Sequence, residues 1–384
     1  MSSVQLVLAF GNLVLGTAAF VVAGIVGAIA ADLGLPLATA GQVLTVFALT
    51  YAIAAPLLAL FTGHWPRRRA LELGLVGVGL GCLAASLAPD AATLFAARVV
   101  TALGAALFAP AAAVAAVQTA APARRARALS LVFLGQSAAQ VLGVPLGTWL
   151  AWTFDWRMAF APVALAATLG VVAVRRVVPA ELGGAPASLA AWASILRRPD
   201  LVLAVALTAL VMAALLAPYT FLAPLLTALT GLDRAAVAPL IWVFGLAGMT
   251  GTLAGGWAAD RLGPVAAMTI ILVVLLLTFA LMPASQGALA PVILLCVVWS
   301  LFGYAFMSPQ QLRLVTLAPP LQAPLLALNA AAIYLGTAAG GALGGLVVGQ
   351  AGPLALPWAT FAMLLVTLAA LALSVRLSRR AGAP

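Results

Sequence analysis

The stretch RRVVPAELGGAPASLAAWASILRRPD, residues 175–200, decides how this chain is organised. Arg175 and Arg176 stand at its start and Arg197 and Arg198 near its end, while the sequence on either side is almost entirely apolar. A polar segment between two long apolar tracts indicates a water-exposed bridge that joins two membrane-embedded halves. Each half is then expected to be a bundle of helices.

The composition agrees with this reading, because 65% of the residues are hydrophobic and only 7% are charged, whereas soluble domains carry roughly a quarter charged residues. A spanning helix needs about 20 apolar residues. Six such runs precede the central segment and six follow it: 5–30, 41–62, 70–89, 92–119, 129–153, 158–178, 201–224, 236–258, 265–284, 288–312, 325–349 and 355–377. We therefore predict an all-α polytopic membrane protein with twelve transmembrane helices. Its N-terminal six-helix bundle would cover residues 1–178, its cytoplasmic linker 179–200 and its C-terminal six-helix bundle 201–384.

The net charge of +10 comes entirely from arginine and is distributed unevenly between the two ends of the predicted spans. One end carries Arg67, Arg68, Arg69, Arg124, Arg125, Arg127, Arg175, Arg176, Arg197, Arg198, Arg261, Arg313, Arg376, Arg379 and Arg380. The loops of the other end carry only Arg157 and Arg234. Because cytoplasmic loops collect positive charge, both termini and the linker are expected in the cytoplasm, with the chain in the plasma (inner) membrane. The same distribution argues for a lipid bilayer rather than nucleic acid as the partner.

Within the linker, Leu189, Trp192, Ile195 and Leu196 follow helical spacing. This pattern predicts a short amphipathic helix resting at the cytoplasmic headgroups. A disordered linker is the alternative.

The first span is expected to be retained, because the N-terminus MSSVQ lacks the basic region of a signal peptide. Cys82 and Cys296 fall inside predicted spans, where a small buried residue is the default. No disulfide, metal or cofactor is expected.

Small residues and prolines recur at matching positions in the two halves. The matched sets are Ala59, Gly63 and Pro66 with Gly256, Asp260 and Gly263; Gly104 and Pro110 with Gly303 and Pro309; and Ala139, Gly143 and Gly147 with Ala332, Gly336 and Gly340. The three sets are offset by 197, 199 and 193 residues, as loops of unequal length would produce. Six spans repeated in one orientation imply a pseudo-two-fold axis along the membrane normal.

These residues resemble the major facilitator superfamily, and within it the twelve-helix drug:proton antiporters with their sugar-efflux and chloramphenicol-resistance relatives. The loop GGWAADRLGP is similar to the family's GxLADRxGR motif at Gly256, Asp260, Arg261 and Gly263. Arg98 stands where the family's fourth helix carries a buried arginine, and GQSAAQVLGVPLGTWL is similar to the fifth-helix motif. The resemblance implies proton-linked export of small molecules by alternating access, associated with drug resistance.

The chain departs from this resemblance at two acidic positions. Gly63 replaces the acid of the first-half loop motif, and the first span reads GTAAF, which places Ala19 where related antiporters often carry an acid. All eight acids fall in predicted loops or at helix ends: Asp32, Glu72, Asp90, Asp155, Glu181, Asp200, Asp233 and Asp260. His64, the only histidine, lies in a loop. The sequence therefore offers no mid-span acid or histidine to bind a proton, and cationic cargo is expected to be poor.

Arg98 is the only charged residue predicted well inside a span. Burying an arginine costs about 2.5–3.5 kcal/mol on insertion scales, so it needs partners. The candidates are polar side chains and backbone carbonyls, Asp32 or Asp90 at the rim, or a substrate. A structural role and a direct role in substrate binding or coupling both stay open.

Polar and aromatic residues of the spans predict an apolar site with few polar groups, which suits small neutral or anionic amphipathic molecules. For each one alone, a helix–helix hydrogen bond or an interfacial anchor is the alternative. The candidate substrate-binding residues are Asn12, Phe20, Tyr51, Arg98, Gln136, Gln140, Tyr219, Trp299, Tyr304 and Asn329.

Small residues let helices approach closely, and Gly143 with Pro145 interrupts the helical hydrogen bonds. A static packing face is the alternative to a moving one. The candidate gating residues are Gly135, Gly143, Pro145, Gly147, Gly256, Asp260, Arg261, Gly263, Gly336 and Gly340.

The sequence thus favours a monomeric exporter whose partners are a small molecule, the bilayer and protons. Uniport or import of a metabolite such as a sugar, without protons, is the second interpretation. A membrane enzyme or receptor is the third. No cluster of catalytic side chains at one depth supports an enzyme.

Overall fold

The computed structural model describes residues 3–121, 125–183 and 189–380, and everything regular within those ranges is helical. Arg124 and residues 184–188 of the predicted linker lie outside them. Within those ranges, eleven helical segments are long and apolar enough to cross a membrane. The remaining span, residues 125–153, is a helix interrupted by a π-helical turn. The prediction of a twelve-helix, all-α membrane protein is therefore confirmed.

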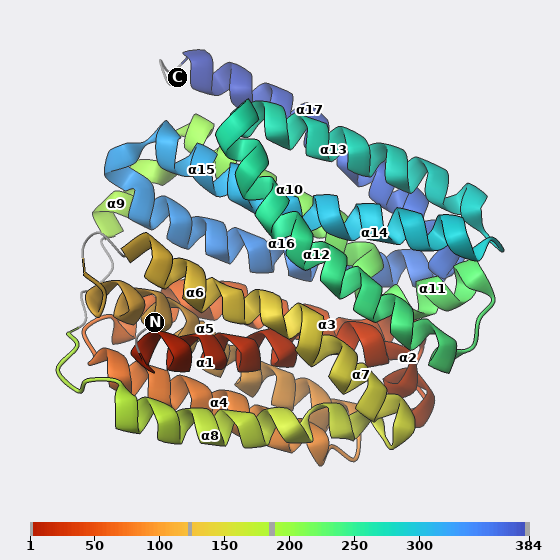
Figure 1. Cartoon of the computed structure of the whole chain (residues 1–384), viewed down its shortest axis with the longest axis horizontal. Helices are drawn as coiled ribbons and strands as arrows, with labels where there is room; N and C mark the ends of the chain where they lie inside the picture. Colours follow the sequence, from red (N-terminus) through yellow and green to blue (C-terminus); the bar gives the residue numbers. More distant parts are fainter. Residues whose placement is uncertain (1–2, 122–124, 184–188, 381–384) are drawn as a thin grey trace. The chain divides into compact units, whose positions relative to one another are not determined.

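The helices of the N-terminal half are shown in red to yellow-green in Figure 1. They are α1 (Ser3–Phe20), α2 (Val22–Asp32), α3 (Leu37–Thr62), α4 (Arg67–Ser86), α5 (Ala91–Gln118), α6 (Arg125–Ala138), the π turn (Ala139–Gly143), α7 (Val144–Thr153) and α8 (Ala161–Val177). Those of the C-terminal half are α9 (Leu189–Leu196), α10 (Pro199–Thr220), α11 (Leu222–Thr230), α12 (Arg234–Leu262), α13 (Pro264–Leu281), α14 (Leu289–Ala305), α15 (Met307–Leu317), α16 (Gln322–Ala351) and α17 (Leu356–Arg380).

The chain forms two compact units, Met1–Leu35 with Val46–Ala187 and Pro36–Thr45 with Ser188–Pro384. The first turns of α3 thus cluster with the second unit. There the Nε2 of Gln42 donates to the carbonyl oxygen of Gly341 on α16 (3.4 Å). The rest of α3 belongs to the first unit, so α3 contributes to both.

Four spans are interrupted, and proline explains three of the interruptions. A proline has no N–H, and its ring clashes with the carbonyl four residues earlier. Pro309 is four residues after Ala305, the last residue of α14, and Pro145 is four residues after Val141 in the π turn. Pro224 is four residues after Thr220, the last residue of α10. The break between α1 and α2 at Val21 has no such cause, since no proline occurs before Pro36.

In the predicted linker, residues Leu189–Leu196 form the helix α9. Ile195 on its inner face is 1% exposed and packs with a cluster that includes Leu201, Leu314 and Leu325, whereas Leu196 is exposed. The alternating exposure of neighbouring residues is what an amphipathic helix requires. α9 is therefore docked on the second unit.

Arg313 differs from its prediction as a loop residue, because it lies inside α15 and is 3% exposed. Its Nη2 donates to the hydroxyl of Ser374 on α17 (2.8 Å). Arg98 is thus not the only arginine buried by the helices. Ser374 and Ser378 are uncharged, so the sequence did not indicate that they pair with an arginine. Their hydroxyls accept hydrogen bonds from the buried guanidinium.

A polar cluster ties the first unit together at the end away from the arginine-rich loops. The carboxylate of Asp32, past the apolar run of α2, accepts hydrogen bonds from the indole of Trp156 (2.9 Å) and from Nη1 of Arg157 (2.9 Å). The Nε of Arg157 also donates to the carbonyl oxygen of Ala88 (2.9 Å). The Trp156 hydrogen bond, followed by Arg157, lowers the pKa of Asp32 below its usual value. Asp32 is therefore a partner of Arg157, as is Asp155 (3.4 Å).

Candidate functional site

The break in the first span lies beside the buried guanidinium of Arg98. In an unbroken helix the carbonyls of Ala18 and Ala19 would accept hydrogen bonds from the N–H groups four residues later. At the interruption, Val21 keeps helical backbone angles and its N–H donates to the carbonyl of Thr17 (3.1 Å), but the N–H of Gly24 donates to the carbonyl of Val21, three residues earlier (3.1 Å). Arg98 donates to the two carbonyls, from Nη1 to Ala18 (2.7 Å) and from Nη2 to Ala19 (3.2 Å).

Aromatic rings surround the same guanidinium. Its central carbon lies 4.5 Å from the ring centroid of Phe47 on α3 and 5.9 Å from that of Phe160 before α8. Arg98 itself is 0% exposed. Both ring faces attract the cation, which offsets part of the free energy lost on removing it from water. Of the partners predicted for Arg98, the structure provides the backbone carbonyls. The two aromatic rings were not predicted, and Asp32 pairs with Arg157 instead.

The corresponding break in the second unit has different chemistry. It falls at Phe221, 200 residues after Val21, and the surrounding positions hold aromatic residues. Phe244, 197 residues after Phe47, lies 4.8 Å from Trp299 and 5.8 Å from Tyr219, measured between ring centroids. The surroundings of the break thus include a cation in the first unit and a cluster of aromatic rings in the second.

Asn329 belongs to a buried hydrogen-bond network within the second unit. Its Oδ1 accepts from the hydroxyl of Thr208 (2.5 Å), and the Nε2 of Gln310 donates to that hydroxyl (2.9 Å) and to the carbonyl of Ala204 (2.6 Å). Asn329 and Gln310 are 1% and 0% exposed. The network joins α10, α15 and α16. In this structure Asn329 therefore forms a helix–helix hydrogen bond, the alternative role given above for each candidate substrate-binding residue.

The remaining candidate substrate residues are dispersed through the walls of their own units. Asn12 is buried and donates from Nδ2 to the carbonyl of Leu8 (3.1 Å), and Tyr51 stacks on Phe47 at 6.5 Å between centroids. Phe20, Gln136 and Tyr304 are half-buried, and Gln140 is buried in the π turn. Arg98 and Tyr51 share a direct neighbour, Phe47.

The glycine stripe of the fifth span packs against the first span. A side chain at Gly135 would collide with the carbonyl of Ala9, and one at Gly143 would collide with Thr17. Gly147 lies in the same way against Val21. Only residues without a side chain permit this approach, so the stripe is a packing surface between α1–α2 and α6–α7.

The matching stripe on α16 packs against the first span of the second unit. Side chains at Gly336 and Gly340 would meet the carbonyls of Ala209 and Ala213 on α10. The two stripes therefore make equivalent contacts within their own units. Pro145 belongs to the interrupted fifth span, as described above.

The second-half loop motif is only partly explained by packing. Gly263 has φ +78°, a conformation that favours glycine, and it separates α12 from α13. Gly256 has open space around it, and Asp260 and Arg261 are exposed. Among the described residues, Asp260 forms no ion pair within 4.0 Å.

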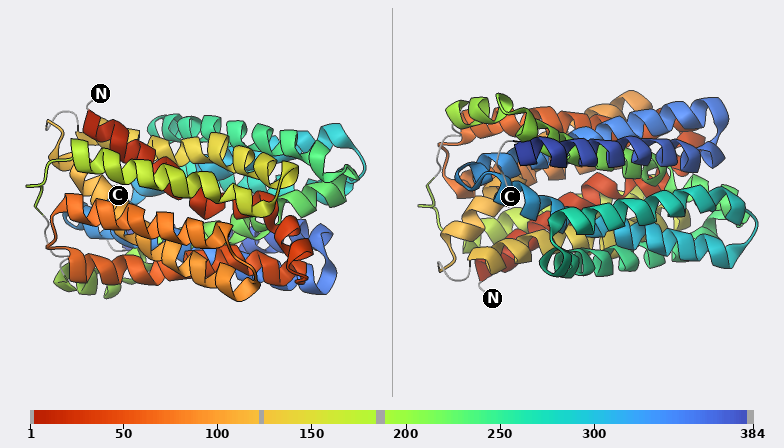
Figure 2. Two further views of the ribbon diagram at one scale, coloured as in Figure 1. Left: turned by 90° about the horizontal axis from the view of Figure 1, so that it is seen from below. Right: turned by 90° about the horizontal axis from the view of Figure 1, so that it is seen from above.

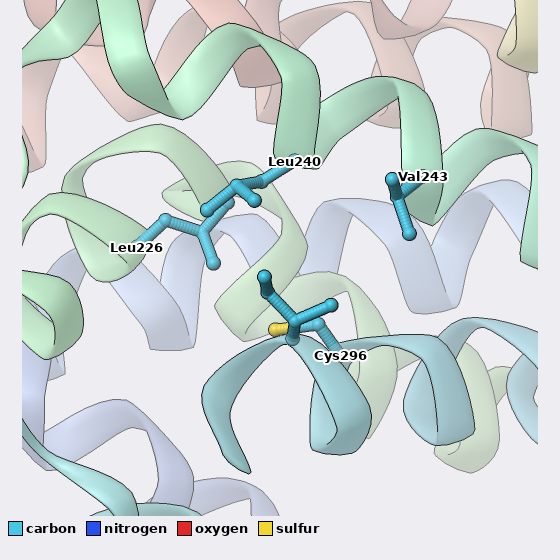
Figure 3. Close-up of a pocket in the computed structure, with 5 residues that line it drawn as sticks. Leu226, Leu240, Val243 and Cys296 are labelled. Atoms are coloured by element: carbon cyan, nitrogen blue, oxygen red, sulfur yellow. The ribbon is translucent and has the colours of Figure 1, made fainter. Parts of the chain in front are cut away.

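A small apolar cavity of about 10 Å³ lies in the second unit, among Leu226, Leu240, Val243, Ile293 and Cys296 (Figure 3). That volume holds about one water molecule, and the lining offers water almost no hydrogen-bond partners. Ligand sites for drug-sized molecules need roughly 300–1,000 Å³. This cavity is therefore a packing defect.

Sequence comparison identifies the family. The family model of the Major Facilitator Superfamily matches residues 8–324, most of the chain. The chain belongs to the major facilitator superfamily. It is a multi-pass integral membrane protein of a transporter family, and the predicted resemblance is confirmed.

Several known proteins are similar to this chain, most of them over nearly its whole length. The uncharacterized MFS-type transporter YbcL of Bacillus subtilis is 28% identical, covering 92% of this chain and 90% of its own length. The inner membrane transport protein YdhP of Escherichia coli is 29% identical, covering 89% and 88%. A chloramphenicol resistance protein of Streptomyces lividans is 37% identical over 64% of each chain. The crystal structure of the peptide transporter POT has a TM-score of 0.78 at 17% identity, covering 98% of this chain and 95% of that one, and it confirms the major facilitator fold.

Sequence reasoning missed other close contacts of this major facilitator chain. Gly74 and Gly104 bring α4 against α5, and Gly251 and Gly255 bring α12 against α14, each facing a backbone carbonyl. The sequence signal was glycine at spacings of three or four within a span. It also missed Thr208, since a threonine in a span usually bonds its own helix rather than a distant amide.

Proposed function

We propose that this protein exports small neutral or anionic amphipathic molecules across the cytoplasmic (inner) membrane by alternating access, with both termini in the cytoplasm. Membership of a transporter family supports transport, and the similarity to a chloramphenicol resistance protein supports export. The arginine-rich loops support the orientation.

The observation that carries the cargo class is a buried cation with no acid at mid-span. Arg98 is 0% exposed within α5. All eight acids lie in the described residues, and each is in a loop or within about two turns of a helix end. A cavity bordered by a guanidinium and lacking a carboxylate attracts anions, accepts neutral molecules and repels cations.

The interrupted spans support a mechanism in which helices bend. The breaks at Val21 and Phe221 occur at equivalent places, and the π turn and the break at Phe306 interrupt two further spans. Broken helices near the middle of a transporter form binding sites and hinges in other carriers. We infer that anionic cargo contacts the Arg98 cluster of the first unit and neutral cargo the Trp299 cluster of the second unit. We also infer that the helices change their angle at the breaks during transport.

A second candidate is uniport without protons, which the placement of the titratable groups favours. A proton-coupled carrier needs a group whose protonation alters the preferred conformation, usually an embedded acid or a histidine. His64, the only histidine, is exposed in the loop between α3 and α4. Export coupled to protons would therefore require a titratable group in a loop or at a helix end to bind the proton.

Flux measurements in proteoliposomes test the cargo and the coupling. The purified chain is reconstituted, and efflux of a neutral amphipathic antibiotic, an organic anion and a cationic dye is followed with and without an imposed pH gradient. Transport of the neutral and anionic molecules is the expected result, and faster transport with the gradient would indicate coupling to protons. Equal rates would support the uniporter. Efficient transport of the dye, abolished by Trp299→Ala, would contradict the proposed cargo class.

A further inference from the structure

A basic hollow lies where the first unit's α4 begins and α8 ends. It measures about 270 Å³ and is lined by Pro66, Arg68, Arg69, Glu72, Arg175 and Ala180. α4 and α8 pack side by side, as Figures 1 and 2 show in orange and yellow-green. The transport mechanism proposed above uses none of these residues.

The charge of the hollow is positive after its internal ion pair is counted. The Nε of Arg68 lies 3.0 Å from Oε1 of Glu72, which neutralises one arginine. Arg69 and Arg175 are both exposed and contribute the remaining charge. The guanidinium of Arg69 is stacked 4.9 Å from the ring centroid of Trp65, which restricts its movement.

Backbone contacts hold the two sides of the hollow together. The N–H of Arg67 donates to the carbonyl of Leu182 beyond α8 (2.8 Å), and its Nη2 donates to the carbonyl of Gly63 (2.9 Å). Arg67 itself is buried, with 8% of its surface exposed. The start of α4 and the segment after α8 are therefore held together by hydrogen bonds of Arg67.

Apolar stripes run from this hollow along both helices. On α4, Leu73, Val76 and Leu80 follow Arg69 at four, seven and eleven residues, and all three are exposed (42%, 39% and 58%). Because such spacing places residues on one helix face, the arginine stands at the head of an apolar stripe. On α8, Leu165, Leu169 and Val172 are exposed in the same way before Arg175.

We propose that this hollow binds the phosphate headgroup of one anionic phospholipid, with its acyl chains along the exposed stripes of α4 and α8. The positive charges of Arg69 and Arg175 attract the negatively charged phosphate, and the exposed apolar stripes provide contacts for the acyl chains. A soluble phosphate compound would make no use of the stripes. The arginine-rich loops place the hollow at the cytoplasmic leaflet, where anionic lipids attract basic residues.

Lipid titration of the whole purified chain tests the site. Native mass spectrometry in detergent counts bound dioleoyl phosphatidylglycerol, with phosphatidylcholine and inorganic phosphate as parallel probes. The test variant is Arg69→Gln with Arg175→Gln. The control is Arg376→Gln with Arg379→Gln, which removes the same charge from exposed positions of α17. Unfolding temperatures verify that both variants are folded.

The unmodified chain is expected to bind one phosphatidylglycerol more tightly than phosphatidylcholine. Each arginine near an anionic headgroup contributes about a fivefold factor, so the test variant should lose about 30-fold in affinity and the control should change little. Equal loss in both variants would mean attraction by surface charge alone and would overturn the site. Displacement of the lipid by millimolar inorganic phosphate would overturn the lipid assignment.

Discussion

Replacement of Arg98 by methionine tests whether the guanidinium maintains the break in the first span. Methionine keeps most of the volume but cannot donate to the carbonyls of Ala18 and Ala19, which Arg98 bonds at 2.7 and 3.2 Å. In the variant those carbonyls can pair only with nearby backbone N–H groups. We expect the first span to straighten at Val21, because an unbroken helix supplies such donors at Val22 and Ala23.

The change in unfolding free energy should be small, because two large effects oppose each other. Losing two hydrogen bonds from a charged donor costs about 1.5–3 kcal/mol each, or about 3–6 kcal/mol together. Removing a buried arginine recovers about 2.5–3.5 kcal/mol. The net destabilisation is therefore about 0–3 kcal/mol, whereas the local hydrogen bonding changes completely.

Amide hydrogen exchange read by mass spectrometry, together with thermal unfolding in detergent, checks this expectation. Exchange in a peptide covering residues 18–24 should slow in Arg98→Met, with transport reduced more than stability. The control is Val297→Met, at the position that corresponds to Arg98 by the 199-residue offset between the fourth and tenth spans, and it should leave that exchange unchanged. Unchanged exchange at residues 18–24 together with normal transport would refute the role of Arg98 in the break.

Three further outcomes are expected. Gly135→Ala should destabilise the fold by about 1–3 kcal/mol because its Cβ meets a backbone carbonyl of α1, whereas Gly256→Ala, in open space, should be neutral in thermal unfolding. The Asp32–Arg157 contact should contribute fully to the free energy of unfolding above about pH 4, and this contribution should be lost as the pH falls through the lowered pKa of Asp32. Because the two side chains are 44% and 24% exposed, Asp32→Asn should cost less than about 1 kcal/mol at pH 7 and nothing in acid. Trp299→Ala should reduce transport of neutral cargo at least tenfold in vesicles, whereas anion transport, which we expect to depend on Arg98, should persist. Equal loss of both would contradict separate binding clusters for neutral and anionic cargo.

The helices were predictable because their cause is local. In lipid each backbone N–H must bond within its own segment, so a run of about 20 apolar residues must be helical. The predicted spans 92–119 and 288–312 correspond to Ala91–Gln118 and to Leu289–Ala305 with Met307–Leu317. The central arginines and the repeated small residues likewise predicted the duplication, because both are read along the chain.

The sequence predicted which residues belong to the candidate site, but not which residues they contact. The sequence identified Arg98 as a buried cation, but its carbonyl partners lie 79 and 80 residues earlier, on a helix that breaks without a proline. Similarly, Asn329 gave no sign that Thr208, 121 residues away, would bond it. Such partners depend on which helices are neighbours, and hydropathy does not encode that.

By itself, then, the sequence determined that this is a twelve-span, internally duplicated membrane protein with no acid at mid-span. Tertiary structure decided that Arg98 meets the broken first span, and that the glycines of the fifth span lie against that same span. The physical reason is that the bilayer imposes helices on any apolar run, whereas a buried guanidinium or a bare glycine acquires its role from the side of the neighbouring helix that it faces.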